Sequence, residues 1–178
     1  MNENVTARCP RCDLPSRIQR PAATAIDRGA ELDGRPLTAT PEVVATWRST
    51  CTGCGLVSPS AKAARLTLQG GDAKGAADLA LLAAWIADDH DPEAAAECRG
   101  IAEWLTRRTG GQDALRADLN RRNGDFDAAI AAARRVVAEA EDPDLVSLSI
   151  HQLQLAHAGD DGRHSMVALF KRLLAEAG

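Results

Sequence analysis

The sequence LRADLNRRNGDFDAAIAAARRVVAEAEDP, residues 115–143, decides the fold class of this chain. Gly124-Asp125 separates two segments of helical pattern, and Asp142-Pro143 ends the second one, because proline cannot continue a helix. Apolar residues of the second segment recur at steps of three and four, which places them on one helical face: Phe126, Ile130, Ala133 and Val137. The stretch therefore predicts two amphipathic helices joined by a short turn.

The same pattern continues through residues 60–178, where alanine and leucine dominate. Aromatic residues make up only 3% of the chain, which favours closely packed helices over a sheet-built core. The short breaks between segments suit antiparallel neighbours. We expect a mainly α protein whose second domain, 60–178, is an antiparallel helical-hairpin solenoid of about seven helices: 61–69, 73–89, 93–108, 112–122, 125–141, 144–158 and 163–177.

Internal similarity supports a repeated unit in this domain. The segment that begins at Gly71-Asp72 can be laid over the segment that begins at Gly124-Asp125. Two further landmarks then match, namely Asp91-Pro92 with Asp142-Pro143 and Gly110 with Gly159. The pattern favours a duplicated helical unit stacked as a short solenoid, although such pairs also punctuate unrelated helical proteins.

Residues 115–143 resemble a tetratricopeptide repeat, in which a Gly-Asp-aromatic turn joins two helices that approach closely at small residues. The matching residues are Ala117, Gly124, Phe126 and Ala129. The resemblance implies a concave face that binds a peptide or protein surface. Three charged residues would face or border that surface: Asp118, Arg121 and Arg122. A solvated polar face is the alternative interpretation.

The first third of the chain differs in character: residues 1–60 contain six of the eight prolines of the whole chain. Long helices are excluded there. Two or three short strands are expected in the segments SRIQRPA, AELDGRPLTA and EVVATWRSTC, with Asp33-Gly34 as a hairpin signal. We therefore predict a separate, β-rich domain over residues 1–59.

Two Cys-x2-Cys turns carry the strongest chemical signal: Cys9-Pro-Arg-Cys12 and Cys51-Thr-Gly-Cys54. Four thiolates satisfy the tetrahedral preference of zinc, and each turn lets two of them reach one ion. We expect one structural Zn²⁺ that folds this domain. Another metal such as iron, or a redox or disulfide role, are the alternatives.

With these paired turns, the first 55 residues resemble a zinc ribbon, and the resemblance implies that the four cysteines are the ligands. Asp13 stands where the first turn of such a ribbon often has glycine. Thirty-eight residues separate Cys12 from Cys51, which is more than a minimal ribbon needs. The segment 21–46 is therefore expected to be an additional hairpin or a mobile loop.

Basic residues cluster around the first turn and could contact a nucleic acid, with one tryptophan as a stacking face. The candidates are Arg8, Arg11, Arg17, Arg20, Trp47 and Arg48. Alternatively, Trp47 packs beneath the metal site and the arginines offset the negative charge of four thiolates. The second interpretation is the simpler one.

Other polar and aromatic candidates have structural explanations. ADDHDP, residues 87–92, is explained by a helix end and an aspartate N-cap before Pro92, with an ion site as the weaker alternative. Cys98 lies on an apolar helical stripe and is expected in the core. Trp85 and Trp104 are expected as buried anchors of the stacked helices.

The composition limits the classes of function. The formal net charge is −4, and the acidic excess lies in residues 61–178, so a general polyanion binder is not expected. The sequence has no apolar run long enough for a membrane span or a signal peptide, which predicts a cytoplasmic protein without a membrane partner. No phosphate-binding loop or nucleophile elbow is recognisable, and we expect no enzyme.

The leading hypothesis is therefore a non-enzymatic zinc-binding adaptor or scaffold whose helical domain binds another protein or peptide. The second is a nucleic-acid-associated regulator, in which the ribbon contacts RNA or DNA and the helices recruit a partner. A third is an enzyme subunit whose active site needs another chain.

Overall fold

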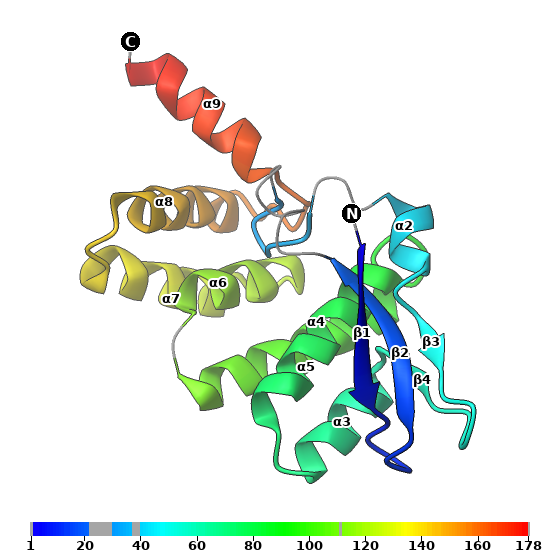
Figure 1. Cartoon of the computed structure of the whole chain (residues 1–178). Helices are drawn as coiled ribbons and strands as arrows, with labels where there is room; N and C mark the ends of the chain where they lie inside the picture. The colour runs from blue at the N-terminus through cyan, green and yellow to red at the C-terminus, as the bar shows by residue number, and fades with distance from the viewer. Residues whose placement is uncertain (1, 22–29, 37–39, 111, 178) are drawn as a thin grey trace.

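A computed structural model describes residues 2–21, 30–36, 40–110 and 112–177. The chain is mainly helical, with two small antiparallel strand pairs near the N-terminus (Figure 1). The strands in the described residues are β1 (Asn2–Arg8), β2 (Pro15–Pro21), β3 (Ser49–Thr50) and β4 (Val57–Ser58). The helices are α2 (Pro41–Ala45), α3 (Ala61–Gln69), α4 (Ala73–Ala87), α5 (Pro92–Thr109), α6 (Asp113–Arg122), α7 (Phe126–Glu139), α8 (Pro143–His157) and α9 (Met166–Ala177).

The seven helices expected after residue 60 are present, and their ends lie within three residues of the predicted bounds. Capping explains this agreement. The Asp72 and Asp125 side chains accept hydrogen bonds from the amides of Gly75 and Ala128, at the starts of α4 and α7. The glycine before each of these caps has a positive φ, as glycine alone readily allows.

The second pair of sequence landmarks also has one structural role. Asp91 and Asp142 are the N-caps of α5 and α8, and a proline follows each of them in the first helical turn. The Asp91 carboxylate accepts from the Ala94 amide, which confirms the predicted N-cap before Pro92. Consecutive helices from α3 to α8 pack against each other. A duplication and a tetratricopeptide-like solenoid stay predictions.

The N-terminal strands are arranged differently from the prediction. β1 pairs with β2 in an antiparallel hairpin in which Val5 lies opposite Ile18, and β1 was not predicted from the sequence. The strand expected over 42–51 is wrong for most of its length, because residues 41–45 form α2. Pro41 in the first turn and the acidic Glu42 favour this helix start.

The predicted Asp33-Gly34 turn is present between two bridged residues, Ala30 and Pro36. Gly34 has a φ of 85°, and the Glu31 amide donates to the Arg35 carbonyl at 2.8 Å. Within the predicted insertion, 21–46, residues 41–45 form α2, where a hairpin or mobile loop was expected. Residues 22–29 and 37–39 lie outside the described residues.

The predicted domain boundary lies between β4 and α3, and side chains from both sides of it share the core. Trp47 packs edge-on against Trp85 of α4, with ring centroids 6.2 Å apart. Leu56 and Ala63 meet in a second cluster beside the cysteines. The N-terminal third is thus packed directly on the helices.

Two tryptophans that were expected as buried helix anchors differ in position. Trp85 is buried, and its indole Nε1 donates to the Asp33 carboxylate at 2.8 Å. Trp104 is 39% exposed, so its prediction is wrong; the Arg108 guanidinium lies 4.8 Å from its ring centroid. Cys98 is buried as expected, and burial raises the pKa of its thiol.

Replacing Trp47 with alanine should lower the free energy of unfolding by about 3–5 kcal/mol, because a large, fully buried side chain leaves a cavity between α2 and α4. Urea titrations followed by far-UV circular dichroism measure the change. Trp104→Ala is the matched control, with an expected loss of less than about 1 kcal/mol. Equal losses in the two variants would contradict this packing.

Candidate metal centre

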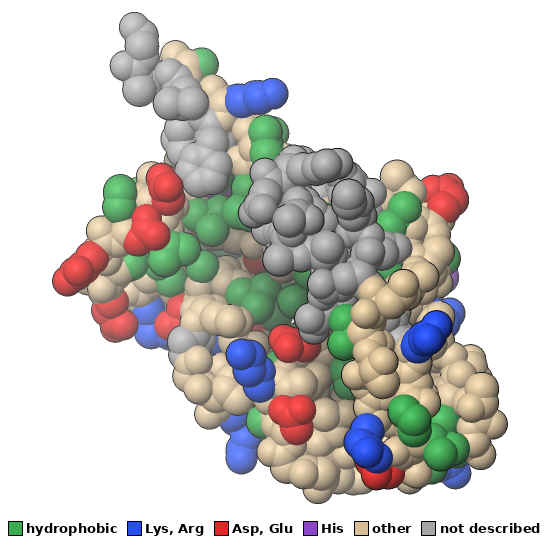
Figure 2. Space-filling view, viewed as in Figure 1, with side chains coloured by type: hydrophobic (Ala, Val, Ile, Leu, Met, Phe, Trp, Pro, Cys, Tyr) green, Lys and Arg blue, Asp and Glu red, His purple; other side chains and the backbone are tan. Residues whose placement is uncertain are grey.

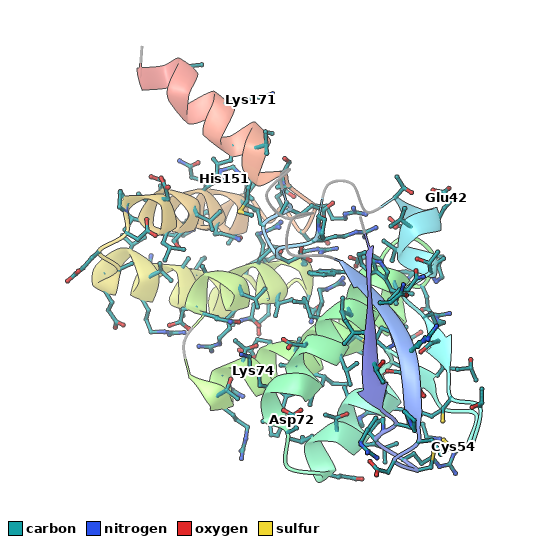
Figure 3. All side chains as sticks on the ribbon, in the orientation of Figure 1. Glu42, Cys54, Asp72, Lys74, His151 and Lys171 are labelled. Atoms are coloured by element: carbon teal, nitrogen blue, oxygen red, sulfur yellow. The ribbon has the colours of Figure 1, made fainter. Side chains whose placement is uncertain are left out.

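The two Cys-x2-Cys turns meet at one end of the molecule. Cys9 and Cys12 lie in the turn between β1 and β2, and Cys51 and Cys54 in the turn between β3 and β4. Their four Sγ atoms all lie within 4.8 Å of one another, close to the position of Cys54 in Figure 3. The cysteines predicted as ligands are therefore positioned to bind one metal ion.

The backbone has the same geometry in both turns. The amide of the first cysteine, Cys9 or Cys51, donates across the turn to the carbonyl of Leu14 or Leu56, in each case at 2.9 Å. The carbonyl of that cysteine accepts from the amide four residues later, again at 2.9 Å in both turns. The two halves of the site are thus related by structure as well as by spacing.

Asp13 and Gly55 are the equivalent residues that follow the two turns, and both have positive φ values, of 61° and 70°. An aspartate here tolerates the left-handed conformation better than most residues. The Arg8 guanidinium supports it by donating to the Asp13 carbonyl at 3.1 Å and its carboxylate at 2.7 Å. The departure from glycine is therefore accommodated locally.

The electrostatics of the second turn favour a thiolate. The backbone amides of Gly53 and Cys54 lower the pKa of the Cys51 thiol to about 6. Amides that point at a sulfur stabilise its negative charge, and a metal binds the deprotonated form. Cys51 is therefore prepared as a ligand by the turn that contains it.

The four cysteines differ in their exposure to solvent. Cys9 and Cys51 are buried against Leu56 and Ala63, whereas Cys12 is exposed. All four are free thiols, and the nearest pairs, Cys9–Cys54 and Cys12–Cys51, have Sγ atoms 3.6 and 3.5 Å apart. Four soft donors suit a tetrahedral, thiolate-preferring ion and fill its coordination shell.

The arginines expected near the first turn are in part where a nucleic acid could reach them. The side chains of Arg8, Arg11, Arg17 and Arg48 are exposed, and the Arg20 side chain lies outside the described residues. Trp47 is buried, with 1% of its surface exposed. It packs on α4 and cannot stack on a base, which corrects that part of the prediction.

The three residues expected on a partner-binding face are inside the protein, which corrects their predicted location. Asp118 and Arg121 are buried and form an ion pair of 2.6 Å on α6. The Arg121 Nη1 also donates to the carbonyls of Asp160 and Gly162, which ties α6 to the segment before α9. The charged residues on this side of α6 therefore contact other segments of the chain and do not face solvent.

Arg122 is the centre of a buried ion cluster that the sequence did not reveal. Its two Nη atoms lie 2.6 Å from the Asp33 carboxylate and 2.8 Å from the Asp88 carboxylate. These carboxylates outweigh burial and raise the pKa of Arg122, whereas burial lowers the pKa of the neighbouring Arg99. We define the buried ion cluster as Asp33, Arg35, Asp88, Arg99 and Arg122, together with Asp89, which pairs with Arg35 at the solvent-exposed edge of the cluster.

Comparison with known proteins gives no further assignment: the chain matches no protein-family model, no curated protein and no solved structure. Among the described residues, no helix has the length and apolar character needed to cross a bilayer.

The purified protein should contain about one metal ion per chain, because the four thiols form a single cluster. Cys51→Ser should release the ion, since it removes the donor that the turn prepares as a thiolate. Inductively coupled plasma mass spectrometry gives the stoichiometry. Cys98→Ala, which lies in the helical core, should keep the metal; a folded wild-type protein without metal would refute the assignment.

Arg122→Met should destabilise the protein by about 3 kcal/mol, because it leaves the buried Asp33 and Asp88 carboxylates without their shared cation. Arg135→Met removes a guanidinium that is 43% exposed and pairs with Asp113, and should cost less than about 1 kcal/mol. Chemical denaturation of both variants measures this difference. Similar costs would show that burial does not govern the two ion pairs.

Proposed function

We propose that this chain is a non-enzymatic, zinc-binding adaptor that binds another protein. The observation that carries the proposal is the cluster of four cysteines, in which every donor comes from the protein. A shell closed by four thiolates offers no coordination position for a substrate or a reactive water. The metal is therefore assigned a structural role.

Zinc suits the site because Zn²⁺ binds four thiolates in a tetrahedral arrangement and has no redox chemistry of its own. When bound, it links the β1–β2 turn to the β3–β4 turn. Leu56 and the buried Cys9 and Cys51 then hold these turns against α3, which supplies Ala63. Each strand pair is too small to be stable alone, so the ion and the helices together support it.

An exposed aromatic side chain on the helical part supports a protein partner. Trp104 is 39% exposed, and aromatic residues are enriched at protein interfaces. In the described residues, Val137, Leu145 and Ile150 are also exposed on the helices, and Leu14 and Val57 are exposed near the metal turns. Apolar side chains that are exposed singly are ordinary on a protein surface, so Trp104 carries this point.

A nucleic-acid-associated regulator is the second candidate, because four arginines near the metal centre are exposed. The acidic surface elsewhere limits this function to that region. Figure 2 shows acidic side chains gathered near the turn between α7 and α8, where four such residues are exposed: Glu139, Glu141, Asp142 and Asp144. The burial of Trp47 also removes the expected stacking surface.

Crosslinking in the native cell should recover a protein partner with the wild-type chain. Half of the sample is treated with nuclease and examined by mass spectrometry, and the untreated half is sequenced for bound nucleic acid. Cys51→Ser should recover less of it, because loss of the metal releases the N-terminal strand pairs from the helices. Recovery of nucleic acid in place of protein would contradict the adaptor. Salt-dependent oligonucleotide binding that is lost in an Arg11→Ala, Arg17→Ala variant would then establish the second candidate.

A further inference from the structure

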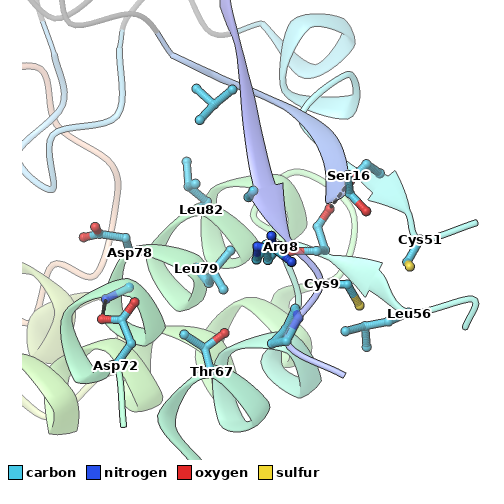
Figure 4. A pocket seen from close by; sticks show the side chains of 16 residues that line it. Arg8, Cys9, Ser16, Cys51, Leu56, Thr67, Asp72, Asp78, Leu79 and Leu82 are labelled. Atoms are coloured by element: carbon cyan, nitrogen blue, oxygen red, sulfur yellow. Dashed lines mark hydrogen bonds between the residues drawn. The ribbon is translucent and has the colours of Figure 1, made fainter. Parts of the chain in front are cut away.

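A cleft of about 410 Å³ lies between the N-terminal strands and the helices. One wall is formed by β1 and the residues around the metal turns, and the other by α3 and α4 (Figure 4). Leu79 and Leu82 of α4 contribute apolar side chains to it, and Val5 and Ala7 line it from β1. The cleft is thus an apolar channel between a strand and a helix.

The strand that borders this cleft has a free edge in the described part of the chain. β1 pairs with β2 alone, and β2 lies between β1 and β3 (Figure 1). In an antiparallel pair, every second residue directs its amide and carbonyl to the partner strand. The Cys9 amide donates to the Leu14 carbonyl, so in this register the amides of Val5 and Ala7 also face β2. The backbone groups of Asn4, Thr6 and Arg8 therefore point outward.

An outward-facing strand edge beside an apolar helix suits one kind of ligand, an extended peptide. Its backbone can pair with the free amides and carbonyls of Asn4, Thr6 and Arg8. Alternate side chains of such a strand lie on the sheet face that Val5 and Ala7 share, where Leu79 and Leu82 oppose them.

A carboxylate at the helix side of the cleft selects the peptide further. Asp72, the N-cap of α4, lines this wall and is exposed (Figure 4). Its Oδ1 accepts from the Gly75 amide at 2.8 Å, which fixes the carboxylate at this wall. Arg8 at the strand side already pairs with Asp13 at 2.7 Å. A basic side chain on the ligand complements the Asp72 carboxylate.

We propose that the cleft between β1 and α4 binds an extended segment of a partner protein, which adds to β1 as a third strand and carries a lysine or arginine among apolar side chains. The proposal rests on the adaptor function above and gives it a site. The metal centre contributes by holding Cys9 and Cys51, two residues of the cleft wall, in place.

A display library of random linear peptides, selected on the full-length, metal-loaded protein, provides the probe. Selected peptides should alternate apolar residues and contain a basic one. A synthetic peptide of the enriched sequence should bind Thr6→Pro roughly tenfold more weakly than wild type, because proline removes an outward amide while the bonds to β2 remain. Thr6→Val keeps that amide and should bind as wild type does.

A backbone N-methyl scan of the same peptide tests strand pairing without altering the protein. Methylation at every second residue should abolish binding, and methylation at the residues between should not. Asp72→Asn keeps an N-cap acceptor for the Gly75 amide and should weaken binding of a lysine-containing peptide, while binding of its glutamine analogue stays unchanged. Metal content and circular dichroism of each variant confirm that it is folded.

An empty selection overturns the cleft proposal, as does a peptide that binds Thr6→Pro and Thr6→Val equally with no alternation in the methyl scan. Neither outcome bears on whether the chain has a protein partner, which the crosslinking experiment decides. Conversely, the selected peptide could bind the purified protein as expected while crosslinking in the native cell recovers no protein. That combination would establish the cleft as a peptide site and contradict the adaptor function.

Discussion

Four sulfur atoms within 4.8 Å of one another repel strongly once they are ionised, and a cation between them removes this repulsion. The arrangement of the N-terminal third depends on this constraint. Neither pair of strands buries enough apolar surface to be stable alone, and β3 and β4 have two residues each. The ligand cluster replaces a core at the tips of these strands, while Leu56 and Ala63 join the same region to the helices.

The position of the metal centre also determines what lies beside it. The turns hold the ends of β1 and β4 close to α3 and α4, but β1 does not pack closely on α4 along its length. The space left between the strand and the helix is the cleft. An ion held by the four cysteines would therefore shape the proposed binding cleft without contacting its ligand, because it would fix the strand that forms one wall.

Local chemistry in the sequence was sufficient to predict the parts of the structure that are built locally. The spacing of the cysteines and the aspartate caps of α4, α5 and α7 each act within a few residues. The valines of α2 suggested a strand, but the Pro41-Glu42 start overrode their β propensity. β1 was missed because its sequence, NENVTAR, is polar and becomes a strand by pairing with β2.

Contacts between distant segments account for the other differences. Asp33 and Arg122 are 89 residues apart in sequence, and no periodic pattern links them. Asp118 and Arg121 were expected on a concave face from the resemblance to a tetratricopeptide repeat, with a solvated polar face as the alternative. The ion pair between them is what allows their burial. Trp104 was expected in the core from its residue type, but its position on α5 leaves it at the surface beside Arg108.

The buried ion cluster has a consequence for how the helices find their arrangement. Apolar surfaces rich in alanine resemble one another, so stacked helices could slide or pair in alternative registers at little cost. Three arginines and three aspartates come together from the Asp33-Gly34 turn, the residues that follow α4, and helices α5 and α6, and their pairing fixes one register. A shift of one helical turn would bury charges without partners. The cluster therefore raises the free energy of packings in the wrong register and favours the native one.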